Sequence, residues 1–255
     1  MKLLKLIQYG TLGWLPFGRR YCVICRHNVW GFLPYRGGVV DVSPLMRSLD
    51  WIGSDVDNFE CPRCGAHDRE RHLYMYLEAT GLLSRLSSMQ IVHFAPEKRL
   101  SRLISAIGVS RYVGCDLYPS RPELERIDIL NTGFESASFD LLIANHVLEH
   151  VDDDMQALSE IYRVLRPGGY AILQTPFSSK LQRTWQDDGI QGEMARLMAY
   201  GQEDHVRLYG KDIFERFSAS GLSSMVRSHE ELLPGVDPIK NGVNLFEPFM
   251  LFRRE

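Results

Sequence analysis

The sequence predicts an α/β protein with a doubly wound sheet, preceded by a smaller cysteine-containing module. From about residue 90 onward, short apolar runs alternate with segments whose apolar residues recur at helical spacing. Before that point the chain is rich in loops and holds four of its five cysteines. A chain of 255 residues is long enough for one full domain and a small additional module.

The first half of the predicted sheet contains four strands. The first two are expected at residues 90–95 and 111–115, with a helix between them at residues 98–107. A third short strand is expected at residues 126–129. The continuous apolar run 139–144 is typical of a central parallel strand, because both faces of such a strand are covered.

The second half of the sheet follows a helix at residues 155–165, whose apolar side chains share one face. The Pro167-Gly168-Gly169 sequence is expected to end this helix, and a fifth strand is expected at residues 170–175. The remaining expected elements are a helix at residues 211–220 and strands at residues 224–229 and 248–253.

These patterns divide the chain into three parts. Residues 1–20 form an apolar and basic N-terminal segment, residues 21–85 a cysteine module, and residues 86–255 the main domain. Within the main domain, the polar stretch 178–210 has no clean strand pattern. We interpret it as an insertion that covers the active site.

The overall charge gives no reason to expect a polyanionic partner. The net charge is −3, from 29 Lys and Arg against 32 Asp and Glu, so nucleic acid is not expected to bind.

The N-terminal segment is too short and too interrupted to span a bilayer, and no signal-peptide cleavage site follows it, so a cytoplasmic location is expected. Its apolar and basic residues could contact a membrane surface weakly. The alternative, which we favour, is a terminal helix packed on its own domain or on a partner subunit.

Two CxxC pairs, Cys22 with Cys25 and Cys61 with Cys64, predict a structural Zn²⁺ site. Tetrahedral zinc takes four thiolates, and four protein ligands leave no open coordination position. A redox pair or four unrelated buried thiols are the competing interpretations, and neither pair opens a helix after a strand as a redox motif would. Cys115 stands alone at a strand end and is interpreted as a small buried apolar residue.

Acidic residues follow the predicted second and third strands. Ligands of an open parallel sheet bind at the carboxyl ends of its strands. Asp116 is therefore placed to bind the ribose hydroxyls of a nucleoside, and Asp128 with Ile129 to contact an adenine ring. The fourth strand is followed by Asn145 and His146.

Three sequence strings carry a family resemblance: residues 139–143 (FDLLI), 145–151 (NHVLEHV) and 160–169 (EIYRVLRPGG). With them, residues 90–254 resemble the class I S-adenosylmethionine-dependent methyltransferases of the small-molecule type, the type 11 group. The cysteine module and the strings 93–97 and 204–210 are similar to a subset found among bacterial sugar and polysaccharide gene products.

The resemblance implies a Rossmann-like, seven-stranded methyltransferase sheet that binds S-adenosylmethionine. The expected cofactor-binding residues are Phe94, Ala95, Pro96, Glu97, Asp116, Leu117, Asp128, Ile129 and Asn145. The first loop departs from the family pattern of an acidic residue and a Gly-x-Gly turn. His93 stands at the acidic position and Ala95-Pro96-Glu97 replaces the glycines, so Glu97 is expected to face the cofactor's ammonium group.

Methyl transfer from a sulfonium needs alignment of the reacting atoms, and an oxygen acceptor also benefits from a base. His205 is our first candidate for that base, oriented by Asp204, with Arg207 holding an anionic group of the acceptor. His146 is the second candidate, and His150 is interpreted as structural.

The favoured function is O-methylation of a small molecule or of a sugar or glycan intermediate. One alternative is an rRNA methyltransferase with a zinc ribbon, in which Arg63, Arg69, Arg71 and His72 would contact phosphate. The other is a catalytically silent binding module.

Overall fold

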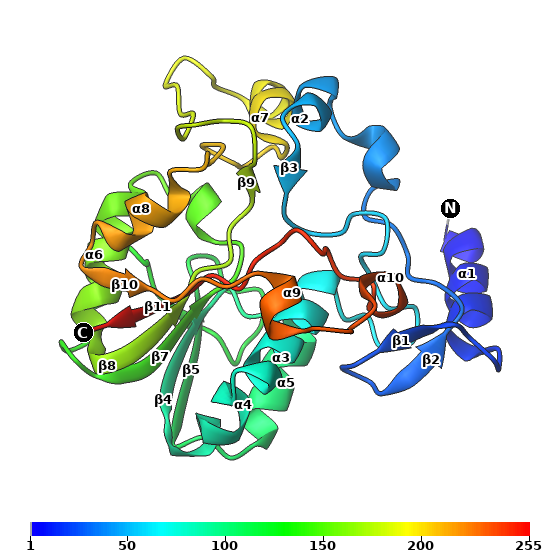
Figure 1. Cartoon of the computed structure of the whole chain (residues 1–255), viewed down its shortest axis with the longest axis horizontal. Coiled ribbons are helices and arrows are strands. Elements are labelled where there is room, and N and C mark those ends of the chain that lie inside the picture. Colours follow the sequence, from blue (N-terminus) through cyan, green and yellow to red (C-terminus); the bar gives the residue numbers. More distant parts are fainter. Residues whose placement is uncertain (1) are drawn as a thin grey trace.

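The computed structural model describes residues 2–255 and contains a seven-stranded sheet that is mostly parallel (Figure 1). The predicted α/β fold and strand number are therefore confirmed. Across the sheet, the strands are β10 (Leu222–Ser224), β11 (Leu251–Arg254), β8 (Leu165–Ile172), β7 (Phe139–Ala144), β4 (Gln90–Phe94), β5 (Arg111–Asp116) and β6 (Glu125–Arg126). Strand β11 runs antiparallel to both of its neighbours, and the pairs from β8 to β6 are parallel.

Helices cover both faces of this sheet (Figure 1). On one face, α6 (Asp154–Val164) and α8 (Ile213–Ser218) pack on β4, β7 and β8. On the other face lie α3 (Asp68–Ala79), α4 (Leu82–Arg85) and α5 (Lys98–Ala106). Alternate residues of β7 enter the two cores, Leu142 into the first and Leu141 into the second, as the period of a strand requires. Because β4, β5 and β7 are parallel, their carboxyl ends meet at one edge of the sheet.

Two predicted boundaries in the second half were wrong. Strand β8 begins at Leu165 and so contains the Pro167-Gly168-Gly169 sequence that was expected to precede it. A register shift opposite β7 accommodates these residues. At Gly169, an added Cβ would lie 2.9 Å from the Arg166 carbonyl oxygen, so the close approach requires glycine.

The strand expected at residues 224–229 ends at Ser224, and helix α9 (His229–Leu232) begins five residues later. Ser228 and Glu231 form a capping box that starts this helix. The third strand is also shorter than expected, because β6 ends at Arg126. A short helix α10 (Pro238–Asn241) and the 3-10 turns η2 (Leu86–Ser88) and η3 (Leu148–His150) lie in the connections.

The N-terminal part contains small paired elements beside the sheet (Figure 1). Strands β1 (Arg20–Cys22) and β2 (His27–Val29) form a hairpin, followed by η1 (Gly38–Asp41), α2 (Pro44–Ser48) and β3 (Trp51–Ile52). Strand β3 pairs with β9 (Phe177–Ser178), and α2 packs on α7 (Glu193–Tyr200) through a shared apolar cluster. The first part of the chain thus covers the insertion. The predicted domain boundaries stay a prediction, although α3 and α4 share the core beneath the sheet.

Helix α1 (Lys2–Trp14) lies against the cysteine module. The Trp30 amide donates to the Leu12 carbonyl at 2.7 Å, and the Arg63 guanidinium lies 4.2 Å from the centre of the Trp14 ring. Met1 and the side chains of residues 2–6 lie outside the described residues. Trp14 and Phe17 are largely exposed, and membrane-surface contact stays a prediction. None of the helices in residues 2–255 has the length and apolar character needed to cross a bilayer.

Candidate active site

A cleft of about 480 Å³ lies at the carboxyl ends of β4, β5 and β7, and we call it the strand-end cleft. Eight of the residues predicted to serve the cofactor or the acceptor line it. They are Phe94, Ala95, Asp116, Leu117, Asp128, Ile129, His146 and Asp204. The cleft therefore brings together residues from the first loop, both acidic strand ends and the insertion.

The two acidic strand ends have similar local geometry. Asp116 Oδ1 accepts from the Tyr118 amide at 2.9 Å, and Asp128 Oδ1 accepts from the Leu130 amide at 2.9 Å. Each carboxylate thus uses one oxygen to fix its own turn, and the other oxygen remains available to a ligand. Ile129 is buried beside Asp128 and offers an apolar surface.

The first loop adopts a backbone conformation that normally favours glycine. Ala95 has a φ of 45°, and its amide donates to the Cys115 carbonyl at 2.7 Å. The loop therefore follows a glycine-like path although the glycines of the family pattern are absent. Its alanine side chain is exposed at the cleft.

Pro96, Glu97 and Asn145, which were predicted to bind the cofactor, do not line the strand-end cleft. Glu97 and Asn145 are buried, and the Asn145 amide donates to Glu97 Oε1 at 2.9 Å. Burial raises the pKa of Glu97, but His93 and Arg69 outweigh it and hold that pKa below its usual range. Among residues 2–255, neither Glu97 Oε2 nor Asn145 Oδ1 has a hydrogen-bond partner, so two buried acceptors remain beside the first loop.

His146 lies between two buried carboxylates. Its Nδ1 is 3.4 Å from Glu149 Oε1, and its Nε2 is 3.5 Å from Glu247 Oε1. Burial lowers the pKa of His146, but the two carboxylates outweigh this effect and raise the pKa to about 9. Neither partner was predicted from the sequence. Glu149 stands in the string 145–151 and could have been found there, whereas no pattern marks Glu247.

Asp204 and His205 are close in sequence but have different partners. Asp204 Oδ2 lies 3.2 Å from His150 Nδ1, and His205 Nδ1 lies 3.0 Å from the Tyr200 carbonyl oxygen. The expected orientation of His205 by Asp204 is thus not observed. His205 lines a second cavity, of about 100 Å³, between the insertion and α2, and burial lowers its pKa.

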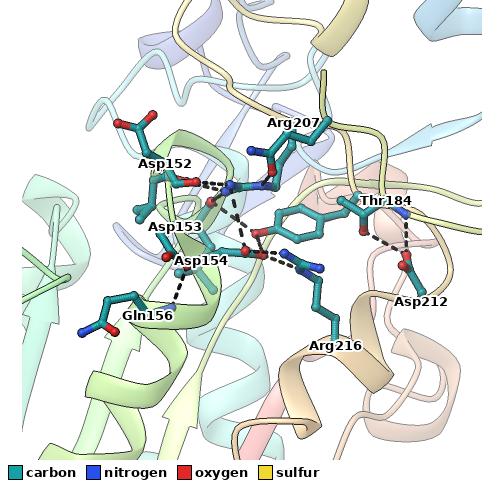
Figure 2. Close-up of polar contacts among 12 residues, drawn as sticks. Asp152, Asp153, Asp154, Gln156, Thr184, Arg207, Asp212 and Arg216 are labelled. Atoms are coloured by element: carbon teal, nitrogen blue, oxygen red, sulfur yellow. Dashed lines mark hydrogen bonds and ion pairs between the residues drawn. The ribbon is translucent and has the colours of Figure 1, made fainter. Parts of the chain in front are cut away.

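Arg207 does not line the strand-end cleft, contrary to the prediction that it holds the acceptor, and contacts Asp152 instead (Figure 2). It is almost completely buried, and it donates to the carbonyl oxygens of Leu148, Val151 and Asp152. Nearby, Asp154 accepts from the Arg216 guanidinium at 2.6 Å and from the Tyr209 hydroxyl at 2.8 Å (Figure 2). This network holds the insertion against the turn that follows β7.

The four cysteines of the two CxxC pairs meet, as predicted. Their four sulfur atoms lie within 4.8 Å of one another, and the sulfurs of Cys22 and Cys64 are 3.8 Å apart. Four thiolates around a tetrahedral zinc ion lie about 3.8 Å apart, given a Zn–S distance of ~2.3 Å. Each pair is followed by the same type of turn. The Arg26 amide donates to the Cys22 carbonyl oxygen and the Gly65 amide to the Cys61 carbonyl oxygen, and both Arg26 and Gly65 have positive φ.

Two of the four basic residues proposed to contact RNA phosphate are buried. Arg71 is fully buried and donates to backbone carbonyls, including those of Ala66 at 2.8 Å and Gly242 at 2.7 Å. His72 is also buried, and Arg69 lies 3.2 Å from Glu97. Arg71 and His72 are therefore not placed to contact phosphate, whereas Arg63 and Arg69 are half-buried and their role stays a prediction.

Comparison with known proteins places a methyltransferase-type sequence in the region that forms this cleft. Residues 99–173 match the family described as "Methyltransferase domain". A probable S-adenosylmethionine-dependent methyltransferase of Mycolicibacterium smegmatis is 37% identical over 59 residues, which are 23% of each chain. Arsenite methyltransferase of Mus musculus is 33% identical over 73 residues, which are 26% of this chain and 19% of the mouse protein. The chain spans at most 23% of the length of the curated relatives it matches.

Similar solved structures share low sequence identity with the chain. An S-adenosylmethionine-dependent methyltransferase from Mesorhizobium loti is 18% identical, with a TM-score of 0.47 over 69% of this chain and 96% of the other. The 1,6-didemethyltoxoflavin-N1-methyltransferase of Burkholderia thailandensis is 17% identical, with a TM-score of 0.46 over 71% and 78%. The family match and the sequence relatives therefore show a methyltransferase-domain sequence over residues 99–173.

Proposed function

We propose that the protein transfers a methyl group from S-adenosylmethionine to an oxygen atom of a small molecule, such as a sugar or glycan intermediate. The observation that carries the proposal is the strand-end cleft, in which Asp116 and Asp128 follow neighbouring strands within the region of the family match. Ribose hydroxyls would bind Asp116, and adenine would lie near Asp128 and Ile129.

The first loop offers acceptors for the amino-acid end of the cofactor. Glu97 Oε2 and Asn145 Oδ1 are buried and accept no hydrogen bond from the described side chains, although His93 Nε2 lies 3.7 Å from Glu97 Oε2. An ammonium group would supply the missing donors. When bound, S-adenosylmethionine supplies an activated methyl group. The residues of this chain then need to hold the acceptor in line with it and exclude water.

The charge of the cleft favours a small acceptor over RNA. Its lining residues include Asp116, Asp128, Asp152 and Asp204, and no Lys or Arg of residues 2–255 lines it. Such a cleft attracts a cationic sulfonium and repels a phosphate backbone. Asp204, His146 and His205 are proposed to serve the acceptor, because Asp204 and His146 line the cleft and His205 lies next to it.

We further propose that the four cysteines bind one structural Zn²⁺ ion. The 3.8 Å between the sulfurs of Cys22 and Cys64, the clustering of all four sulfurs and the matching turns after Cys25 and Cys64 support this proposal.

The test has two steps. Calorimetry with S-adenosylmethionine and S-adenosylhomocysteine measures cofactor binding. If folded protein binds neither at millimolar concentration, the methyl-transfer proposal fails and the alternative of a catalytically silent binding module is favoured. A radiolabelled methyl-transfer screen over nucleotide sugars, oligosaccharides and total RNA then identifies the acceptor class. Label in RNA alone would contradict the small-molecule proposal.

A further inference from the structure

Three metal-ligating side chains from distant parts of the sequence meet beside the strand-end cleft. They are Glu149 and His150, which follow β7, and His205 of the insertion. One ligand atom from each lies within 4.8 Å of the other two, and His150 Nε2 is 3.9 Å from Glu149 Oε1. Glu149 and His205 are buried, and the His150 side chain is 31% exposed.

Both imidazoles are oriented from behind, through Nδ1. The Tyr200 carbonyl oxygen lies 3.0 Å from His205 Nδ1, and Asp204 Oδ2 lies 3.2 Å from His150 Nδ1. A histidine that binds a metal through one nitrogen usually donates its other N–H to a carbonyl or carboxylate oxygen. The two contacts therefore leave both Nε2 atoms free for an ion.

The Glu149 carboxylate is buried beside two histidines but accepts no hydrogen bond from either of them. Both of its oxygens are buried, and neither has a hydrogen-bond partner among residues 2–255. The nearest histidine nitrogens, on His146 and His150, lie 3.4 and 3.9 Å from Oε1. These ion-pair distances are longer than hydrogen bonds and leave both carboxylate oxygens without a donor, and a bound cation would coordinate them directly.

The backbone holds the ligands together before any ion binds. The Val206 amide donates to the Glu149 carbonyl oxygen at 2.9 Å, which joins the segment of His205 to that of Glu149. Arg207 adds hydrogen bonds to three carbonyls of the same turn, as Figure 2 shows. A site preorganised in this way binds an ion without ordering a loop.

The geometry points to a divalent transition-metal site formed by Glu149, His150 and His205. Imidazole and carboxylate ligands suit ions such as Mn²⁺, Fe²⁺, Co²⁺ and Zn²⁺, and three protein ligands leave coordination positions open. His150 lines the strand-end cleft and His205 the smaller cavity beside it, so the ion lies where the two adjoin.

This position also assigns the ion a role, which rests on the proposed function. An acceptor hydroxyl oxygen binds the ion at an open position, and the ion lowers the pKa of that hydroxyl. The oxygen lone pair forms the new C–O bond while the C–S bond breaks, its electron pair stays on sulfur, and the hydroxyl proton passes to water. In this arrangement His205 is a metal ligand and not the base.

The test uses Mn²⁺, because thiolates select softer ions and the four cysteines then remain with zinc. Protein that carries one equivalent of zinc, enough for the four cysteines only, is titrated with Mn²⁺, and free Mn²⁺ is followed by electron paramagnetic resonance. We expect one Mn²⁺ per chain. Glu149→Gln should weaken binding at least ~10-fold, in the range expected for a metal-site lesion. Glu193→Gln, which removes a charge from the same insertion, should bind as the wild type does.

A second variant covers the case in which Glu149→Gln does not fold. His205→Gln keeps a polar side chain of similar size, and its near-ultraviolet circular dichroism reports whether the fold is intact. Folded His205→Gln with wild-type Mn²⁺ affinity would overturn the inference, as would wild-type protein that binds no Mn²⁺ at millimolar concentration. Because Mn²⁺ binding is measured without methyl transfer, either proposal can fail while the other stands.

Discussion

The Arg207 guanidinium donates to the backbone carbonyl of Leu148 at 2.9 Å, although 59 residues separate them. The same side chain also contacts the carbonyls of Val151 and Asp152 (Figure 2). Charge-assisted hydrogen bonds from the buried Arg207 side chain thereby join the insertion to the turn after β7. Shape, and not only charge, makes arginine suitable here, because its planar fork presents donors in several directions.

Arg207→Lys should therefore destabilise the protein while keeping the charge. Lysine cannot reach the three carbonyls at once, so we expect the free energy of unfolding to fall by about 2–4 kcal/mol, the loss of at least one or two hydrogen bonds to a charged group. Urea denaturation measures the change. Arg183→Lys, at an exposed position in the same insertion, is the matched control. Equal stability of the two variants would show that the network contributes little.

Cys61→Ser should release the ion from the cysteine module. Elemental analysis is expected to show one zinc per chain less than in the wild type, and the module should lose stability by several kcal/mol, because metal binding and folding are coupled in such sites. Cofactor binding should persist. Cys115→Ser, which alters the cysteine outside the cluster, should keep its zinc. An unchanged zinc content in Cys61→Ser would contradict the structural-zinc proposal.

Asp116→Asn should weaken binding of S-adenosylhomocysteine by about 1.5–3 kcal/mol, the usual contribution of hydrogen bonds to a charged group. The variant keeps the oxygen that accepts from the Tyr118 amide, so the turn should remain folded. Asp128→Asn should cost less, because that side chain is more exposed. Titration calorimetry gives both values. Glu123→Gln carries the same charge change outside the cleft, and a comparable loss there would indicate a general field effect.

The sheet could be predicted from the sequence because its strands are apolar runs with clear ends. The run 139–144 coincides with β7, since a central strand buried on both faces shows in composition alone. The boundaries that failed depend on information beyond periodicity. The start of β8 depends on its pairing with β7, and α9 on the capping box of Ser228 and Glu231.

The site was harder to predict than the fold, because its geometry comes from contacts between distant residues. The strand-end position of Asp116 was readable, since topology alone puts it at the cleft. Arg71 was interpreted as a phosphate contact and Arg207 as a ligand of an anionic acceptor group, because arginine binds anions readily. Both are buried, because backbone carbonyls elsewhere in the chain satisfy them. Nothing local in the sequence reveals such partners.

Asp68 gives a test of pH dependence. Burial raises the pKa of this carboxyl to about 7, despite the opposing effect of Arg71. Its pKa in the unfolded chain is about 3.9, so the folded state binds the proton more tightly and loses stability as the pH rises from about 4 to about 7. Asp68→Asn removes this loss and keeps an oxygen that can accept from the Asp55 amide.

The stability difference between Asp68→Asn and wild type should therefore grow with pH, by on the order of 2–4 kcal/mol between pH 4.5 and pH 8. Urea denaturation of both proteins at the two pH values gives it, and the titration of all other groups cancels in the comparison. A difference that stays constant, or one that shrinks as the pH rises, would show that Asp68 is ionised in the folded protein.

Ala95→Gly tests whether the first loop carries backbone strain at the cofactor site. A left-handed conformation costs alanine roughly 1–2 kcal/mol relative to glycine, whereas glycine loses about 0.4–1 kcal/mol through the greater freedom of the unfolded chain. The Ala95 methyl group is exposed, so little burial is lost, and we expect a net stabilisation of about 0.5–1 kcal/mol. Ala137, with a φ of 54°, has the same type of strain outside the cleft. Ala137→Gly should therefore raise stability to a similar degree and leave the affinity for S-adenosylhomocysteine unchanged.

Ala95→Gly should also bind the ligand at least as tightly as the wild type, because removing the methyl group lets the cofactor approach the backbone. If Ala95→Gly instead weakens binding tenfold while Ala137→Gly does not, the alanine side chain itself contacts the cofactor, and the glycine-free loop is a binding surface and not a tolerated departure from the family pattern.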